Sequence, residues 1–336
     1  MSTFPIKAIA LLWAGLNCLS SCSGQQTFGT NLLRVVRMIP LTGIKGRIDH
    51  LDINLATRVV YISALGNNSL EEVDLRTGKL IRSIGGLDGP QGVVYIPRFD
   101  EVMVANGGNG KCDFFNARTG QKLGMVQLSG DADNVRLGPG GIKVYVGYGH
   151  GGIAVIDAHT HLVNALVQLP AHPESFQLDE GGNRIFVNLP DAGMTAVLDK
   201  QHLKVVGTWR RALPAGNFPM AMDTAHHQLY IGYRFPSRLI TLDDRTGKIL
   251  AENALAPDAD DLYFDYLSGS IFASCGAGFL DIYRLQTAGT MKQVGAIPTR
   301  KGARTALLVP ALRLLLLAER AAGGKPAQLV VYKILD

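Results

Sequence analysis

The sequence is poor in charged residues, tryptophan and cysteine, and each of these shortages excludes a class of protein. Charged residues make up only 18% of the 336 residues and apolar residues 47%, which excludes a disordered chain. The four cysteines form no Cys-x-x-Cys-His haem site. No apolar run longer than about a dozen residues has a helical period. With 39 glycines and 15 prolines, the composition predicts an all-β fold rich in turns.

Clusters of basic residues are also missing. The net charge is +5, but the lysines and arginines are scattered and no basic helix is present. Because a nucleic-acid-binding surface concentrates its positive charge, this distribution disfavours nucleic acid as the main partner.

The amino terminus has the pattern of an export signal. Residues 8–19 are apolar, and the following Leu-Ser-Ser-Cys, residues 19–22, resembles a bacterial lipobox. The resemblance implies a signal peptide at residues 1–21, lipidation of Cys22 and a flexible tether at residues 22–31. The alternative is an ordinary cleaved signal with an incidental Cys22. Either way we expect a bacterial envelope protein in the periplasm or at the outer membrane. The lipoprotein, which we favour, would contact the membrane only through its lipid.

A hairpin turn recurs along the rest of the chain. The Thr-Gly turn at residues 73–84 has counterparts that begin at Phe115, Ile156, Leu198 and Asp243. The apolar segments before these hairpins repeat every 41 to 44 residues, starting at Ile48, Gln91, Asp133, Glu174, Phe218, Asp261 and Arg304. Four short strands in each such period are typical of propeller blades, so residues 32–336 are predicted to form a seven-bladed β-propeller.

The last repeat ends early, after its third strand. We therefore expect the apolar segment at residues 32–39 to pair with the last blade and close the ring. Cys112 and Cys275 fall in blades 2 and 6, so their Cα atoms are expected to lie farther apart than the roughly 7 Å that a disulfide spans. Both thiols are therefore expected to be free and inert. We expect a monomer.

Two of the repeats carry a family resemblance. Residues 102–123 and 144–163 resemble the YVTN-type repeats of YncE-like β-propellers, and the likeness extends over residues 32–336. That superfamily is also similar to bacterial lactonases and quinoprotein-like propellers. Only Trp13 and Trp209 are present, so the tryptophan signature of the quinone-dependent enzymes is missing. The resemblance implies the fold, and one propeller scaffold hosts many functions.

Polar residues mark the start of every innermost strand, where a propeller brings all its blades to one end of the channel. The predicted ligand-binding residues are Arg47, His50, Gln91, Asp133, Asn134, His172, Glu174, Asn217, Asp260, Asp261 and Arg304. Solvation of the channel alone would explain polar residues here. Because the residue types differ from blade to blade, they favour one asymmetric polar ligand.

A hydrolase of the lactonase type is the alternative. The resemblance implies a divalent cation, Ca²⁺ or Mg²⁺, held by oxygen ligands, for which Glu174, Asn217, Asn134 and Asp261 are the candidates. His50, His172 or Glu174 would then be catalytic. Five other histidines lie in predicted turns and are expected to be exposed and without a role: His159, His161, His202, His226 and His227.

The interpretation that fits these patterns best is a ligand-binding or scaffold module rather than an enzyme. Its partner would be a small molecule, a glycan or an envelope protein bound at the channel mouth. Nucleic-acid binding, which some YncE-like relatives suggest, is the second alternative.

Overall fold

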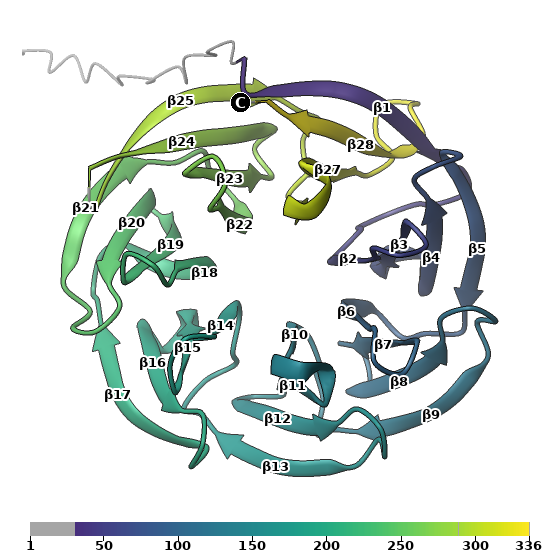
Figure 1. Ribbon diagram of the computed structural model, residues 1–336, viewed down its shortest axis with the longest axis horizontal. Coiled ribbons are helices and arrows are strands. Elements are labelled where there is room, and N and C mark those ends of the chain that lie inside the picture. The colour runs from purple at the N-terminus through teal and green to yellow at the C-terminus, as the bar shows by residue number, and fades with distance from the viewer. Residues whose placement is uncertain (1–30, 288, 336) are drawn as a thin grey trace, which may run out of the picture.

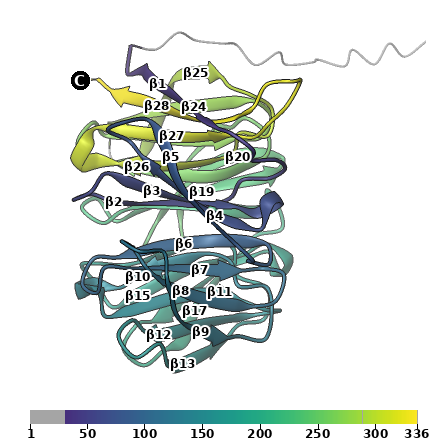
Figure 2. The same cartoon turned by 90° about the vertical axis from the view of Figure 1, so that its right-hand side faces the viewer.

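The protein is a closed ring of seven antiparallel sheets with four strands each. The computed structural model describes residues 31–287 and 289–335. The chain runs once around a central channel, and each sheet is one blade (Figures 1 and 2). In six blades the strands follow sequence order from the channel outward, whereas in the seventh the amino-terminal strand is the outermost. The predicted all-β, seven-bladed propeller is therefore confirmed.

The strand bounds follow the repeat. Blade 1 consists of β2 (Leu51–Asn54), β3 (Val59–Ala64), β4 (Ser69–Asp74) and β5 (Lys79–Gly85). Blade 2 consists of β6 (Pro90–Ile96), β7 (Glu101–Asn106), β8 (Lys111–Asn116) and β9 (Lys122–Gln127). Blade 3 consists of β10 (Val135–Leu137), β11 (Lys143–Tyr148), β12 (Gly152–Asp157) and β13 (Val163–Gln168). Blades 4 and 5 consist of β14 (Phe176–Leu178), β15 (Arg184–Leu189), β16 (Met194–Asp199) and β17 (Lys204–Arg210); and β18 (Ala215–Asp223), β19 (Gln228–Phe235), β20 (Ser237–Asp243) and β21 (Ile249–Ala254).

Blades 6 and 7 complete the ring. They consist of β22 (Ala259–Asp265), β23 (Ser270–Cys275), β24 (Phe279–Thr287) and β25 (Thr290–Pro298); and β26 (Thr305–Val309), β27 (Leu314–Glu319), β28 (Ala327–Ile334) and β1 (Leu33–Leu41). The described helices are short 3-10 turns: η1 (Leu65–Asn67), η2 (Pro139–Gly141), η3 (Pro190–Ala192) and η4 (Pro310–Leu312). None of them is long and apolar enough to cross a membrane.

The recurring hairpin turn joins the third and fourth strands of blades 1 to 5. Its first residue, such as Asp243, accepts hydrogen bonds from the backbone N–H groups two and three residues later, at 3.0 and 2.9 Å. The turn then passes through a left-handed residue, which is a glycine at Gly78, Gly120 and Gly247 but His161 and Leu203 in blades 3 and 4. The shared conformation explains why the sequence pattern repeats.

The ring closes through strand β1. It pairs antiparallel with β28 from Leu33 opposite Ile334 to Leu41 opposite Ala327, and Figure 1 shows these two strands side by side. The predicted pairing of the amino-terminal strand with the last blade is confirmed. The predicted signal peptide, Cys22 and residues 22–30 of the tether lie outside the described residues.

Apolar side chains fill the spaces between neighbouring blades. Cys112 and Cys275 belong to two separate inter-blade clusters, where both are buried and free. Burial raises the pKa of both thiols, which keeps them protonated at neutral pH. The prediction of free, inert thiols is therefore confirmed.

Candidate ligand site in the central channel

The innermost strands bring a charged cluster together at one end of the channel. We call it the mouth cluster. It contains three arginines, two histidines, two amides and seven carboxylates: Arg47, Arg234, Arg304, His50, His172, Gln91, Asn134, Asp49, Asp131, Asp133, Glu174, Asp258, Asp260 and Asp261. Apart from Asn217, every residue predicted to bind the ligand belongs to it.

His50 lies at the centre of this cluster, among three carboxylates. Its Nε2 is 3.7 Å from Asp49 Oδ1 and 3.8 Å from Asp133 Oδ1, while its Nδ1 is 3.6 Å from Asp261 Oδ1. Burial alone would lower the pKa of His50, but the carboxylates of Asp261, Asp49 and Asp133 raise it to about 10. His50 is therefore a fixed cation at neutral pH and unsuited to act as a general base there.

Arginines neutralise part of the acidic charge. Arg304 Nη1 lies 3.0 Å from Asp258 Oδ1, and its Nε lies 3.0 Å from Asp260 Oδ2. Arg234 pairs with Asp260 from the other side and stacks over the Phe218 ring, 3.6 Å from its centroid. This part of the cluster is a charge-balanced network.

Acceptor oxygens remain in excess beside His50. Asp133 Oδ1 and Asn134 Oδ1 are buried and accept no hydrogen bond, and the Glu174 carboxylate forms no hydrogen bond or ion pair with the described residues. Burial and the neighbouring Asp49 raise the pKa of Asp133 to about 7, and burial raises that of Glu174. These oxygens surround a cavity of only about 20 Å³, so the site has room for a single small group that donates hydrogen bonds.

The predicted cation ligands do not gather at one point. Asn134 and Glu174 line the small cavity, and Asp261 lies beside His50. The Asn217 amide instead donates hydrogen bonds to Asn188 Oδ1 and Met194 O, at 3.0 and 2.9 Å. Throughout residues 31–287 and 289–335, no three His, Cys, Asp or Glu side chains are grouped to hold a metal ion. This arrangement gives the metal-assisted hydrolase no support.

One turn histidine differs from expectation. The prediction that His161 is exposed is wrong, because its ring stacks on Phe114 with 3.9 Å between centroids. Its Nε2 also lies 2.7 Å from Glu101 Oε2 on the neighbouring blade. His161 therefore links blades 2 and 3.

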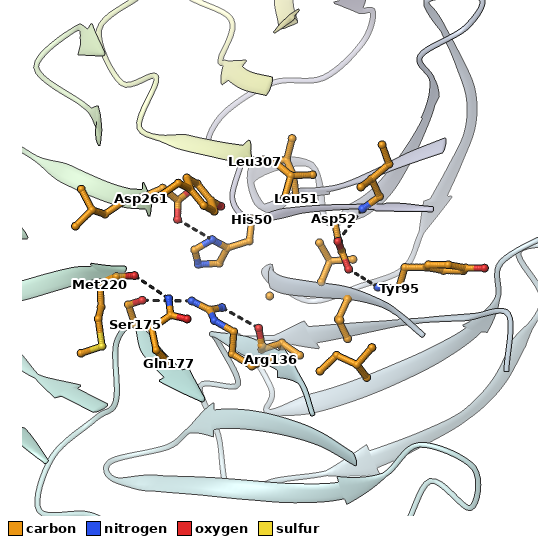
Figure 3. A pocket seen from close by; sticks show the side chains of 18 of the residues that line it. His50, Leu51, Asp52, Tyr95, Arg136, Ser175, Gln177, Met220, Asp261 and Leu307 are labelled. Atoms are coloured by element: carbon orange, nitrogen blue, oxygen red, sulfur yellow. Dashed lines mark hydrogen bonds and ion pairs between the residues drawn. The ribbon is translucent and has the colours of Figure 1, made fainter. Parts of the chain in front are cut away.

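A larger chamber lies beyond His50, farther along the channel. It has a volume of about 450 Å³, and Figure 3 shows the His50 imidazole and the Arg136 guanidinium projecting into it. Its wall comes from all seven innermost strands and includes Asp52, Val94, Arg136, Gln177, Met220, Tyr263 and Leu307. Sequence reasoning missed this chamber.

A signal for the chamber was present in the sequence. Side chains of a strand alternate, so the residues two positions after the strand starts face the same channel. This step leads from Asn134 to Arg136 and from Asp261 to Tyr263, both of which line the chamber. Applying the two-residue period to every innermost strand would have identified the second layer.

Comparison with known proteins identifies the fold. No family model and no curated protein sequence matches the chain. A chain from the crystal structure of the mitotic checkpoint complex superposes with a TM-score of 0.78 at 15% identity, covering 100% of this chain and 99% of that one. Kuenenia stuttgartiensis hydrazine synthase superposes with a TM-score of 0.71 at 15% identity, covering 84% of this chain and 96% of that one. At such low identity the likeness shows the seven-bladed β-propeller scaffold and nothing finer.

Proposed function

We propose that this chain is an exported, lipid-anchored propeller of the YncE-like kind, which binds a partner at its mouth cluster. The proposal rests on the Oδ1 atoms of Asp133 and Asn134, which are buried and accept no hydrogen bond from the described residues, although His50 Nε2 lies 3.8 Å from that of Asp133. Such groups are costly unless water or a ligand donates hydrogen bonds to them, and a ligand that displaces the water must supply the same donors. The partner, a small molecule, glycan or envelope protein, therefore presents an amine or another group rich in donors.

The charge of the mouth cluster separates the alternatives. Seven carboxylates face three arginines and the His50 cation, and such an excess of acid repels the phosphate backbone of nucleic acids. The structural likeness to a chain of a multi-protein complex adds only that this scaffold can carry protein-binding surfaces.

A diamine tests the mouth cluster. We expect 1,5-diaminopentane to raise the melting temperature of the purified chain in a saturable way, while 1,5-pentanediol does not. Glu174→Gln combined with Asp133→Asn should weaken diamine binding by about tenfold or more, because both changes remove charge from the acceptors. The matched control is Glu252→Gln, an exposed carboxylate on the outer strand β21. Equal binding by the double variant and the control would contradict the proposal.

The anchor has its own test. In cells supplied with radioactive palmitate, we expect the label on the wild type and on Cys18→Ser, since Cys18 precedes the proposed cleavage site. Cys22→Ser should lose both the label and its place in the membrane fraction. Label that persists in Cys22→Ser would refute lipidation at this residue.

A further inference from the structure

The chamber and the mouth cavity are separate spaces with different chemistry. His50 and Ser175 line both, and the His50 side chain stands between them. The mouth cavity has a volume of about 20 Å³, which admits one donor group of a ligand, whereas the chamber, with about 450 Å³, can enclose a whole small organic molecule.

Hydrogen-bond donors are in excess inside the chamber. Arg136 Nη1 donates to Val135 O at 2.8 Å, and its Nη2 donates to Ser175 Oγ at 3.3 Å. A guanidinium has five N–H donors, so three remain unused. No carboxylate among the described residues lies within ion-pair distance of Arg136, and burial lowers its pKa without discharging it.

The carboxylates of the chamber are already engaged. Asp52 accepts the backbone N–H groups of Ile53 at 2.8 Å and Tyr95 at 2.6 Å. Asp261 accepts the backbone N–H of Ala306 at 2.8 Å and faces His50 with its other oxygen. Neither carboxylate forms an ion pair with Arg136, although the charges of Asp261 and Asp52 act on it from a greater distance. The remaining N–H groups of Arg136 are therefore open to acceptors of a ligand.

Apolar side chains form about half of the wall. Val94, Leu137, Met220, Leu262 and Leu307 surround the space around the guanidinium. Such a wall favours a ligand with a hydrocarbon body, since burying it contributes about 0.8 kcal/mol per CH₂ group.

We propose that this chamber binds a small organic acid, with the carboxylate on Arg136 and the hydrocarbon body against the apolar wall. A carboxylate matches the fork of a guanidinium with two parallel hydrogen bonds. This site lies on the other side of His50 from the mouth cluster and does not depend on the function proposed for that cluster.

Hexanoate, 1-hexanol and inorganic phosphate test the two halves of the proposal. In calorimetric titrations of the full chain, we expect saturable hexanoate binding about 10-fold to 100-fold tighter than that of the matched alcohol. Phosphate, which has the charge but no hydrocarbon body, should bind more weakly than hexanoate. Equal affinity for hexanoate and 1-hexanol, or no hexanoate binding at millimolar concentration, would overturn the proposal, as would phosphate binding at least as tight as hexanoate.

Variants of Arg136 locate the site. Arg136→Met should abolish the preference for hexanoate over 1-hexanol, and Arg136→Lys should keep part of it because the charge remains without the fork. The matched control is Arg98→Met, an exposed arginine in the turn that follows β6. Circular dichroism checks the fold of each variant. If Arg136→Met does not fold, the affinities of the wild type for hexanoate, 1-hexanol and phosphate test the proposal by themselves. Unchanged preference in Arg136→Met would place hexanoate elsewhere.

Discussion

Replacing His50 with leucine is expected to lower the free energy of unfolding by about 3–5 kcal/mol at pH 7, the range for breaking a buried ion pair. The histidinium lies within 3.8 Å of Asp49 and Asp133 and 3.6 Å from Asp261, and only 18% of its side chain is exposed. Leucine has a similar size, so the loss arises mainly from Asp133 and Asp261, which lose their counter-ion, whereas Asp49 keeps Arg47 at 2.8 Å. Urea denaturation of both proteins measures it.

The same variant should change how stability depends on pH. The pKa of His50 rises from its ordinary 6.5 to about 10 in the folded state, so between these values the folded protein keeps a proton that the unfolded chain has released. Stability is then fully present below about pH 6.5 and falls as the pH rises toward 10. Asp133, whose pKa is raised to about 7, acts in the same direction between its ordinary 3.8 and 7.

The comparison that isolates His50 is the slope of stability between pH 7 and pH 9, below the range in which tyrosines ionise. His50→Leu should flatten this slope. His150→Leu, which changes an exposed loop residue, should keep both the slope and the stability of the wild type within about 0.5 kcal/mol. Identical slopes for the wild type and His50→Leu would show that His50 carries no raised pKa.

The fold was predictable because its signals are local and repeat. The hairpin turn has the same backbone conformation at Gly78 as at Gly247, so each copy supports the assignment of the others. Ring closure followed from counting strands, since one strand was missing at the end and an unpartnered one lay at the start. Neither inference needed to know which side chains touch.

The site was predictable only as far as topology decides it. The innermost strands all start at the same end of the channel. His50 and Glu174 therefore lie at that end, whichever side chains they contact. The engagement of Asn217 with Asn188 depends on how two neighbouring blades pack, which no local pattern encodes. The volume of the chamber likewise depends on how closely the strands approach one another, as at Gly92, where a Cβ would collide with the backbone oxygen of Asp133.

Ring closure makes strand β1 a critical part of the fold, and Ile39→Ala tests this. Ile39 is 0% exposed and belongs to the cluster of apolar side chains between blades 7 and 1, where it lies opposite Leu329. Truncating a buried isoleucine leaves a cavity, so we expect a loss of about 2–5 kcal/mol in the free energy of unfolding. Urea denaturation measures this loss.

The neighbouring residue on the same strand provides the control. Met38 is 57% exposed on the opposite face of β1. Met38→Ala also truncates an apolar side chain of this strand, but it should change the free energy of unfolding by no more than about 0.5 kcal/mol. If the two variants were equally stable, β1 would be only loosely attached to β28, and blade 7 would hold without it. A large difference between them instead shows that the amino-terminal strand locks the ring, which keeps the strand starts around one axis and so maintains both the mouth cluster and the chamber.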